Sequence, residues 1–143
     1  MAKGTTFDND LLKLIFQGTA IANLADNAAA SPITNLYVAL HTADPSAGNQ
    51  NTSEVVYTSY ARVAVARNGT GWTVTGASAV NAGAVTFPAC TGGSNTAAYV
   101  SIGKNATGVA GEIYYSGALN ATLAISNGIT PQFGAGNLNT TES

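Results

Sequence analysis

Charged side chains are scarce in this sequence, and their absence excludes several classes of protein. Only 8% of the 143 residues are Asp, Glu, Lys or Arg, whereas an ordinary soluble domain contains about 25%. The five basic residues are spread between Lys3 and Lys104. No basic cluster can therefore neutralise several phosphates, and we expect no nucleic-acid partner. Because hydrophobic residues reach 45%, the sequence predicts an ordered domain with a nearly uncharged surface and not a disordered chain.

Long apolar runs and a secretion signal are also absent. No apolar run approaches the ~20 residues that a membrane-spanning helix needs. Asp8 and Asp10 precede the first apolar stretch, and no cleavage site follows it, unlike the arrangement in a signal peptide. We therefore expect no membrane partner and synthesis in the cytoplasm.

A single cysteine and a single histidine limit the chemistry that the chain can perform. Cys90 cannot form a disulfide within the chain, so stability must come from packing or from assembly. His41 is followed by Asp44 but by no cluster of further ligands, whereas a tight metal site needs about three or four. We expect His41 to hydrogen-bond into the turn after its strand and Cys90 to be a small buried thiol. The sequence predicts no catalytic site, metal or cofactor; an enzyme would need a His41–Cys90 or a His41–Asp44 pair.

Two further patterns have both a chemical and a structural interpretation. Asp44 and Glu54 could act as paired carboxylates in sugar hydrolysis, but turn formation and solvation also account for them. Trp72 and the tyrosines could stack on carbohydrate, although aromatic side chains at strand spacing more often fill a core or an interface.

Residues 7–25 form the one region with a convincing helical period. Gly18 lies in its interior, where glycine costs about 1 kcal/mol relative to alanine. We therefore expect a bend or break at Gly18 that gives two short helices. Leu12 and Phe16 lie beside the polar stripe of this region, so they either complete a broad core-facing surface or contact a partner.

The sequence after the helical region alternates in short segments that are typical of strands. Residues 35–41 have a period of two, and a long polar loop, residues 43–53, follows them. We expect residues 60–67 to be the neighbouring strand. Asn68-Gly69 indicates a hairpin that returns through residues 72–75.

About eight short strands are predicted in all, with turn signals between most of them. The later ones are expected at residues 85–87, 97–103, 113–116, 119–125 and 138–141. This pattern is typical of an antiparallel β-sandwich or jelly roll. The sequence therefore predicts a mainly β fold in a single domain, residues 1–143, with an N-terminal helical arm at residues 1–30 and a β-sandwich at residues 35–143.

Four segments of the chain resemble a family of small tailed-phage virion proteins. They are DNDLLKLIFQGTAIANLADNA, NLYVALHTADP, YARVAVAR and YYSGALNATLAISNG, and together they span most of the chain. Proteins of this family are labelled as tail-fibre proteins or as capsid cement proteins. The resemblance implies a β-sandwich or jelly roll that is made in the host cytoplasm and binds the exterior of a capsid lattice as a small oligomer.

The residue composition agrees with a passive structural role, because few charges lower the cost of desolvating a surface in a permanent interface. We expect a non-enzymatic capsid cement, or decoration, protein that binds the phage major capsid protein as a homo-oligomer, with a dimer as the commonest form. The alternative is a tail-fibre protein that binds a receptor or carbohydrate. The candidate interface residues are Leu12 and Phe16 in the helical arm and Asp44, Asn49, Gln50 and Asn51 in the polar loop.

Overall fold

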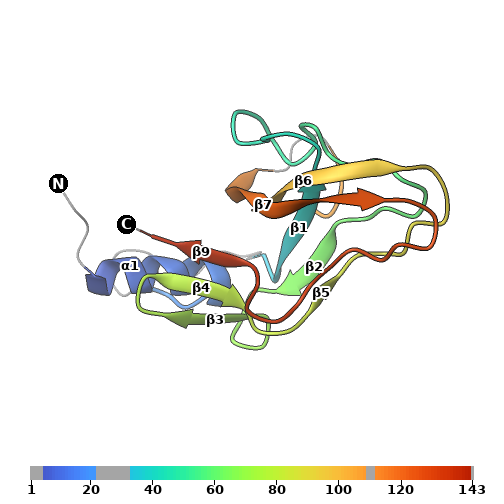
Figure 1. Cartoon of the computed structure of the whole chain (residues 1–143). Coiled ribbons are helices and arrows are strands. Elements are labelled where there is room, and N and C mark those ends of the chain that lie inside the picture. Colours follow the sequence, from blue (N-terminus) through green and yellow to red (C-terminus); the bar gives the residue numbers. More distant parts are fainter. Residues whose placement is uncertain (1–4, 22–32, 109–111, 143) are drawn as a thin grey trace. The chain divides into compact units, whose positions relative to one another are not determined.

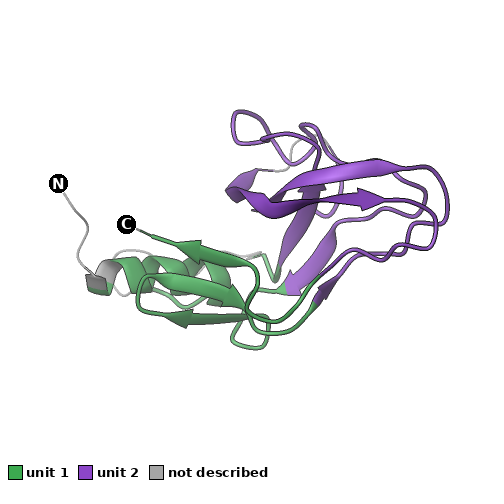
Figure 2. Cartoon of the chain, viewed as in Figure 1, with its two compact units in different colours: residues 1–35, 66–84, 133–143 green, residues 36–65, 85–132 purple. Residues whose placement is uncertain are grey.

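The computed structural model describes residues 5–21, 33–108 and 112–142. The chain forms two compact units, each built from separated parts of the sequence (Figure 2). The first unit contains residues 1–35, 66–84 and 133–143, and the second contains residues 36–65 and 85–132. No helix among the described residues is long and apolar enough to cross a membrane.

The first unit joins the helical segment to a three-stranded antiparallel sheet (Figure 1). The helical segment consists of the α-helix α1, Thr5–Leu12, and the π-helical turn η1, Lys13–Gln17. The sheet order is β3-β4-β9, with β3 at Trp72–Thr75, β4 at Ser78–Asn81 and β9 at Asn139–Thr141. α1 packs against β3 and β4, and η1 packs against β3. The core of this contact is a pair of fully buried rings, Phe16 and Trp72, whose centroids are 4.6 Å apart.

The helical segment ends at Gly18. Its φ of +67° is left-handed, a conformation that glycine adopts without steric cost. Arg67 covers the same end, because its guanidinium donates to the carbonyl oxygens of Leu14 and Ile15, which have no partner within the helix. The predicted break at Gly18 is confirmed. The second short helix predicted after Gly18 does not begin within residues 19–21, which are not helical, and residues 22–25 lie outside the described residues.

The second unit is organised around a four-stranded sheet. Its strands, in the order β2-β1-β6-β7, are β2 Val63–Ala66, β1 Asn35–His41, β6 Asn95–Gly103 and β7 Ile113–Ile125. β6 pairs antiparallel with both β1 and β7. β1 is buried along nearly its whole length. A separate two-stranded sheet pairs β5, Val85–Thr86, with β8, Gln132–Phe133.

The prediction of a mainly β fold with antiparallel sheets and an N-terminal helix is confirmed. An arrangement of sandwich type is compatible with these sheets. β2 is the neighbour of β1, as predicted. The single domain with a separate helical arm stays a prediction; the described helical residues belong to the same unit as β3, β4 and β9.

The predicted hairpin between β2 and β3 is wrong, because β3 pairs with β4 in the other sheet. Asn68 does form a turn, in which its Oδ1 accepts the N–H of Thr70 and its backbone oxygen accepts the N–H of Trp72. That turn leads the chain towards Phe16, against which the Trp72 ring is buried. Burial of the large ring therefore decides the pairing, and a local turn signal does not contain this information. The two strands predicted at residues 113–116 and 119–125 form the single strand β7.

Candidate functional site

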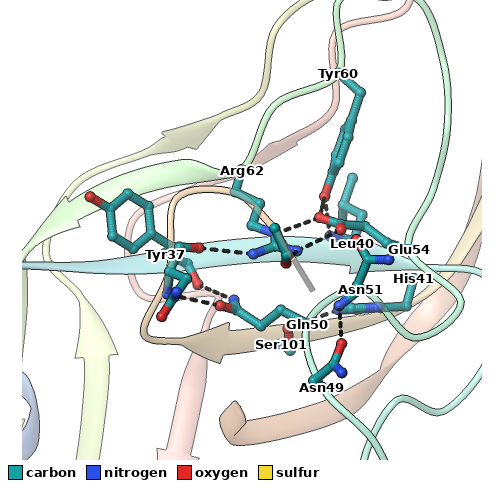
Figure 3. A network of polar contacts seen from close by, with 12 residues as sticks. Tyr37, Leu40, His41, Asn49, Gln50, Asn51, Glu54, Tyr60, Arg62 and Ser101 are labelled. Atoms are coloured by element: carbon teal, nitrogen blue, oxygen red, sulfur yellow. Dashed lines mark hydrogen bonds and ion pairs between the residues drawn. The ribbon is translucent and has the colours of Figure 1, made fainter. Parts of the chain in front are cut away.

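The polar loop, residues 43–53, is held in place within the second unit by buried polar side chains (Figure 3). His41, the last residue of β1, is fully buried. Its Nδ1 lies 2.9 Å from the backbone oxygen of Thr52, and its Nε2 lies 2.8 Å from Ser101 Oγ. Because a carbonyl oxygen only accepts, Nδ1 donates to Thr52, and in the neutral ring Nε2 accepts from the Ser101 hydroxyl. The predicted bond from His41 into the following turn is confirmed.

Burial lowers the pKa of His41 below its ordinary value, because the positive imidazolium loses its water of hydration. The neutral ring is therefore the form that the fold holds near neutral pH. Because both ring nitrogens are hydrogen-bonded, the His41 side chain holds the polar loop against the sheet.

Gln50 also holds the polar loop through hydrogen bonds inside the protein. Its side chain is fully buried, its Nε2 donates to the backbone oxygen of Tyr37 at 2.9 Å, and its Oε1 accepts the N–H of Asn105 at 3.2 Å. Gly103 provides the space, since a Cβ at that position would lie 2.3 Å from Gln50 Cδ and 2.4 Å from the backbone oxygen of Glu112. The amide of Gln50 therefore ties the polar loop to β1 and to the segment after β6.

A buried ion pair completes the network. Arg62 binds Glu54 in a bidentate manner, with Nε···Oε1 at 2.7 Å and Nη2···Oε2 at 2.8 Å. The two side chains are only 3% and 13% exposed. Arg62 also donates to the backbone oxygens of Asn105 and Gly108. The hydrogen bond to Glu54 raises the pKa of Arg62, so this guanidinium stays charged and joins two loops.

Tyr60 links this ion pair to β1. Its hydroxyl donates to Glu54 Oε1 at 2.9 Å and accepts the N–H of Leu40 at 3.1 Å. Burial raises the pKa of Tyr60, and the neighbouring Glu54 carboxylate raises it further. The phenol therefore remains a neutral hydrogen-bond donor. Glu54, Tyr60 and Arg62 thus all have hydrogen-bond partners within the protein.

The outer surface of the polar loop consists of small side chains on a hydrogen-bonded backbone. Asp44 Oδ1 accepts the N–H of Ser46 at 2.9 Å, and Asn49 Oδ1 accepts the N–H of Asn51 at 2.8 Å. The bond from Ser46 lowers the pKa of Asp44, which is the one charged residue of the loop. The exposed residues of the loop are Ala43, Asp44, Ser46, Ala47, Gly48, Asn51 and Ser53.

Two serines, one at the end of the loop and one after it, have a strained backbone. Ser53 has a φ of +52° and Ser59 a φ of +81°, and this left-handed region costs a residue with a Cβ about 1–2 kcal/mol. The N–H and the hydroxyl of Thr42 both donate to the backbone oxygen of Ser53, at 2.7 and 3.1 Å. Strain of this kind persists where the surroundings fix the backbone, and it is common at binding loops.

The six candidate interface residues fall into different environments. Leu12 and Phe16 are fully buried, so the core alternative describes them and they offer no surface to a partner. Gln50 is also fully buried and acts inside the chain. Asp44 and Asn51 are exposed on the polar loop, and Asn49 is half-buried beside them.

Side chains that could have taken part in catalysis or ligand binding are hydrogen-bonded or buried in the structure. The Cys90 thiol is 1% exposed and donates to the backbone oxygen of Gly92 at 3.3 Å. Glu54 is bound by Arg62 and Tyr60, and Trp72 is buried against a phenylalanine ring. Among residues 5–21, 33–108 and 112–142, no three His, Cys, Asp or Glu side chains are grouped so as to hold a metal ion.

Sequence reasoning missed the buried network itself. The predicted strand places Arg62 and Tyr60 together on one face, with Glu54 just before it. A signal was present, because Arg62 is one of only five basic residues and lies in an otherwise apolar segment, where a charge needs a partner.

Comparison with known protein families matches residues 2–141 to the family described as podophage GP4 fiber I protein gp80. A search of curated proteins finds no match. The family match includes the helical segment, every strand and the polar loop, and it agrees with the resemblance to tailed-phage virion proteins. The chain therefore belongs to the family of the podophage GP4 fiber I protein gp80, a family of structural proteins of the phage virion.

Proposed function

We propose that this protein is a non-enzymatic structural part of the phage particle and that its polar loop binds another protein of the particle. The observation that carries this proposal is the buried network beneath the loop. His41 and Gln50 hold the loop from inside, and the ion pair of Arg62 with Glu54 joins it to the segment after β6. A surface loop with so many internal bonds has a fixed shape.

A fixed shape favours binding, because a loop that is already ordered loses little conformational entropy when a partner covers it. The exposed part of the loop has one charge and several small polar groups. Such a surface can approach a partner backbone closely and form neutral hydrogen bonds with it.

The internal hydrogen bonds of His41 and the burial of Cys90 support a role without catalysis. A general base needs a nitrogen or carboxylate that can reach a substrate proton, whereas both nitrogens of His41 are bonded inside the protein. A nucleophilic thiol is usually partly exposed and close to a positive charge, whereas Cys90 is buried.

For the location in the particle we favour a fibre, because the family is described by a fiber protein. The second candidate is the capsid exterior, where the chain would be a cement protein that binds the major capsid protein. The charged fraction of 8% favours this second candidate, since permanent lattice contacts desolvate large surfaces.

Copy number and a gene deletion distinguish these locations. A fibre protein should be present in some tens of copies or fewer, and particles without it should adsorb poorly to cells but resist heat normally. A cement protein should approach the copy number of the major capsid protein, and particles without it should lose DNA at a lower temperature, because binding to the assembled lattice stabilises it. Particles that lack the protein and are normal in both respects would contradict both locations.

The role of the polar loop can be tested with particles that lack the protein and are supplied with purified variants. Asn51→Arg and Asp44→Arg place a bulky cation on the exposed surface of the loop. We expect each to weaken incorporation at least tenfold, which corresponds to about 1.4 kcal/mol. Ala89→Arg, at an exposed position outside the loop, is the matched control and should be incorporated normally. Normal incorporation of both loop variants would contradict the proposed contact.

A further inference from the structure

The longest strand of the protein lies at the edge of its sheet. β7 has 13 residues and is the last strand in the order β2-β1-β6-β7 (Figure 1). Among the described residues, no strand pairs with its outer side. The outer side of an edge strand presents backbone N–H and C=O groups that can pair with another strand.

β7 lacks most of the features that keep sheet edges apart. Natural edge strands carry charges, proline or bulges, or they are short; of these features β7 has a bulge. β7 has no charged residue and no proline, and no Asp, Glu, Lys or Arg occurs anywhere between Glu112 and Glu142. β6, beside it, is also free of charge. The exposed residues of β7 are Ser116, Gly117, Ala118, Asn120, Ala121, Thr122 and Ala124.

A bulge interrupts the pairing of β7 with β6 near the middle of the strand. Tyr99 of β6 lies opposite Ala118, and Ala97 lies opposite Leu123. Residues 119–122 therefore stand opposite Ala98 alone, which cannot satisfy the backbone groups of four residues. Because residues 120–122 are exposed, water or another strand can pair with these groups.

We propose that the outer edge of β7 is a homodimer interface, in which residues 116–125 of two copies pair antiparallel about a two-fold axis close to the bulge. A two-fold contact brings the same surface of each copy together, so any charge would meet itself. β7 has none. An edge without charge can therefore meet a second copy of itself without like-charge repulsion. A second copy is thus the occupant that fits.

The contact offers backbone hydrogen bonds in the number that a specific dimer needs. Regular antiparallel pairing of ten residues forms about ten of them, the bulge lowers this number, and a typical protein interface contains about five to fifteen. The small side chains of the exposed positions let the two backbones approach closely. This inference does not depend on whether the protein is located in a fibre or on the capsid.

Charge substitution at the proposed axis tests the inference. We expect the purified full chain to sediment as a dimer at micromolar concentrations and Ala121→Lys to sediment as a monomer, because two ammonium groups would meet across the axis. Ala121→Glu should be monomeric for the same reason. An equimolar mixture of the two variants should recover the dimer, since opposite charges then face each other, and this recovery would also show that both variants are folded.

Ala106→Lys is the matched control, because it adds the same charge at an exposed loop position in the same unit; it should remain a dimer. The inference is overturned if the unmodified chain is monomeric or forms only polydisperse aggregates. It is equally overturned if Ala121→Lys stays dimeric, if the mixed variants stay monomeric, or if the control dissociates as well.

Discussion

Replacing Arg62 with methionine should destabilise the protein strongly. The substitution keeps an unbranched chain of similar length but removes the cation that binds Glu54 through two hydrogen bonds of 2.7 and 2.8 Å. Since the two side chains are 3% and 13% exposed, little water can replace the lost partner. Removing one member of a buried ion pair costs about 3–5 kcal/mol. We expect about 3 kcal/mol here, because the Tyr60 hydroxyl still donates to Glu54.

The double variant Arg62→Met with Glu54→Gln separates loss of a contact from an unpaired charge. The neutral amide that this variant carries at position 54 can still accept the Tyr60 hydroxyl and leaves no buried carboxylate. The double variant should therefore be more stable than Arg62→Met alone, although the carbonyl oxygens of Asn105 and Gly108 still lose their donor. The measurement is urea unfolding of both variants and of the unmodified protein. A loss of about 3 kcal/mol should also lower the melting temperature by roughly 6–12 °C.

Lys104→Met is the matched control, because Lys104 is an exposed cation close to the same segment. Its cost should stay within about 0.5 kcal/mol. The reasoning is refuted if Arg62→Met costs less than about 1 kcal/mol, or if the double variant is less stable than Arg62→Met.

Three further substitutions test the site. Burial lowers the pKa of His41, so its stabilising effect is fully present above about pH 6.5 and is lost as the pH falls through the folded-state pKa; His41→Gln should show a smaller drop in melting temperature between about pH 7 and pH 5 than the unmodified protein, and equal drops would contradict this. Gly103→Ala should cost about 1–3 kcal/mol in urea unfolding, because its Cβ would lie 2.4 Å from the backbone oxygen of Glu112; Gly69→Ala, with open space around it, should be nearly neutral. Ser53→Gly should raise the free energy of unfolding by about 0.5–1 kcal/mol, because glycine relieves the strain of a φ of +52°; a lower free energy of unfolding would contradict this.

The features that sequence predicted correctly are those that neighbouring residues determine. The strand at residues 35–41 follows from its period of two, and the end of the helix at Gly18 follows from the cost of glycine within a helix. The bond from His41 into the next turn also depends on residues nearby in the chain.

The features that sequence did not predict depend on distant residues. Gln50 reads as an ordinary polar loop residue, and its burial depends on the space left by Gly103. The partner strand of Trp72 depends on the Phe16 ring more than fifty residues earlier. For Leu12 the helical period allowed either a core or an interface role, and only packing against the rest of the fold decides between them.

The division of the first unit among three segments of the chain affects how the protein can fold during synthesis. Its sheet is completed by β9, whose Thr140 hydroxyl donates to the backbone oxygen of Ala79, 61 residues earlier. Every strand of the second unit is made before β9. While residues 139–141 are still inside the ribosome, one edge of β4 therefore lacks its partner strand, so the first unit cannot be completed before the second unit has emerged. The first unit can therefore be completed only after residues 139–141 have been translated and released, as expected for contacts between distant parts of a chain.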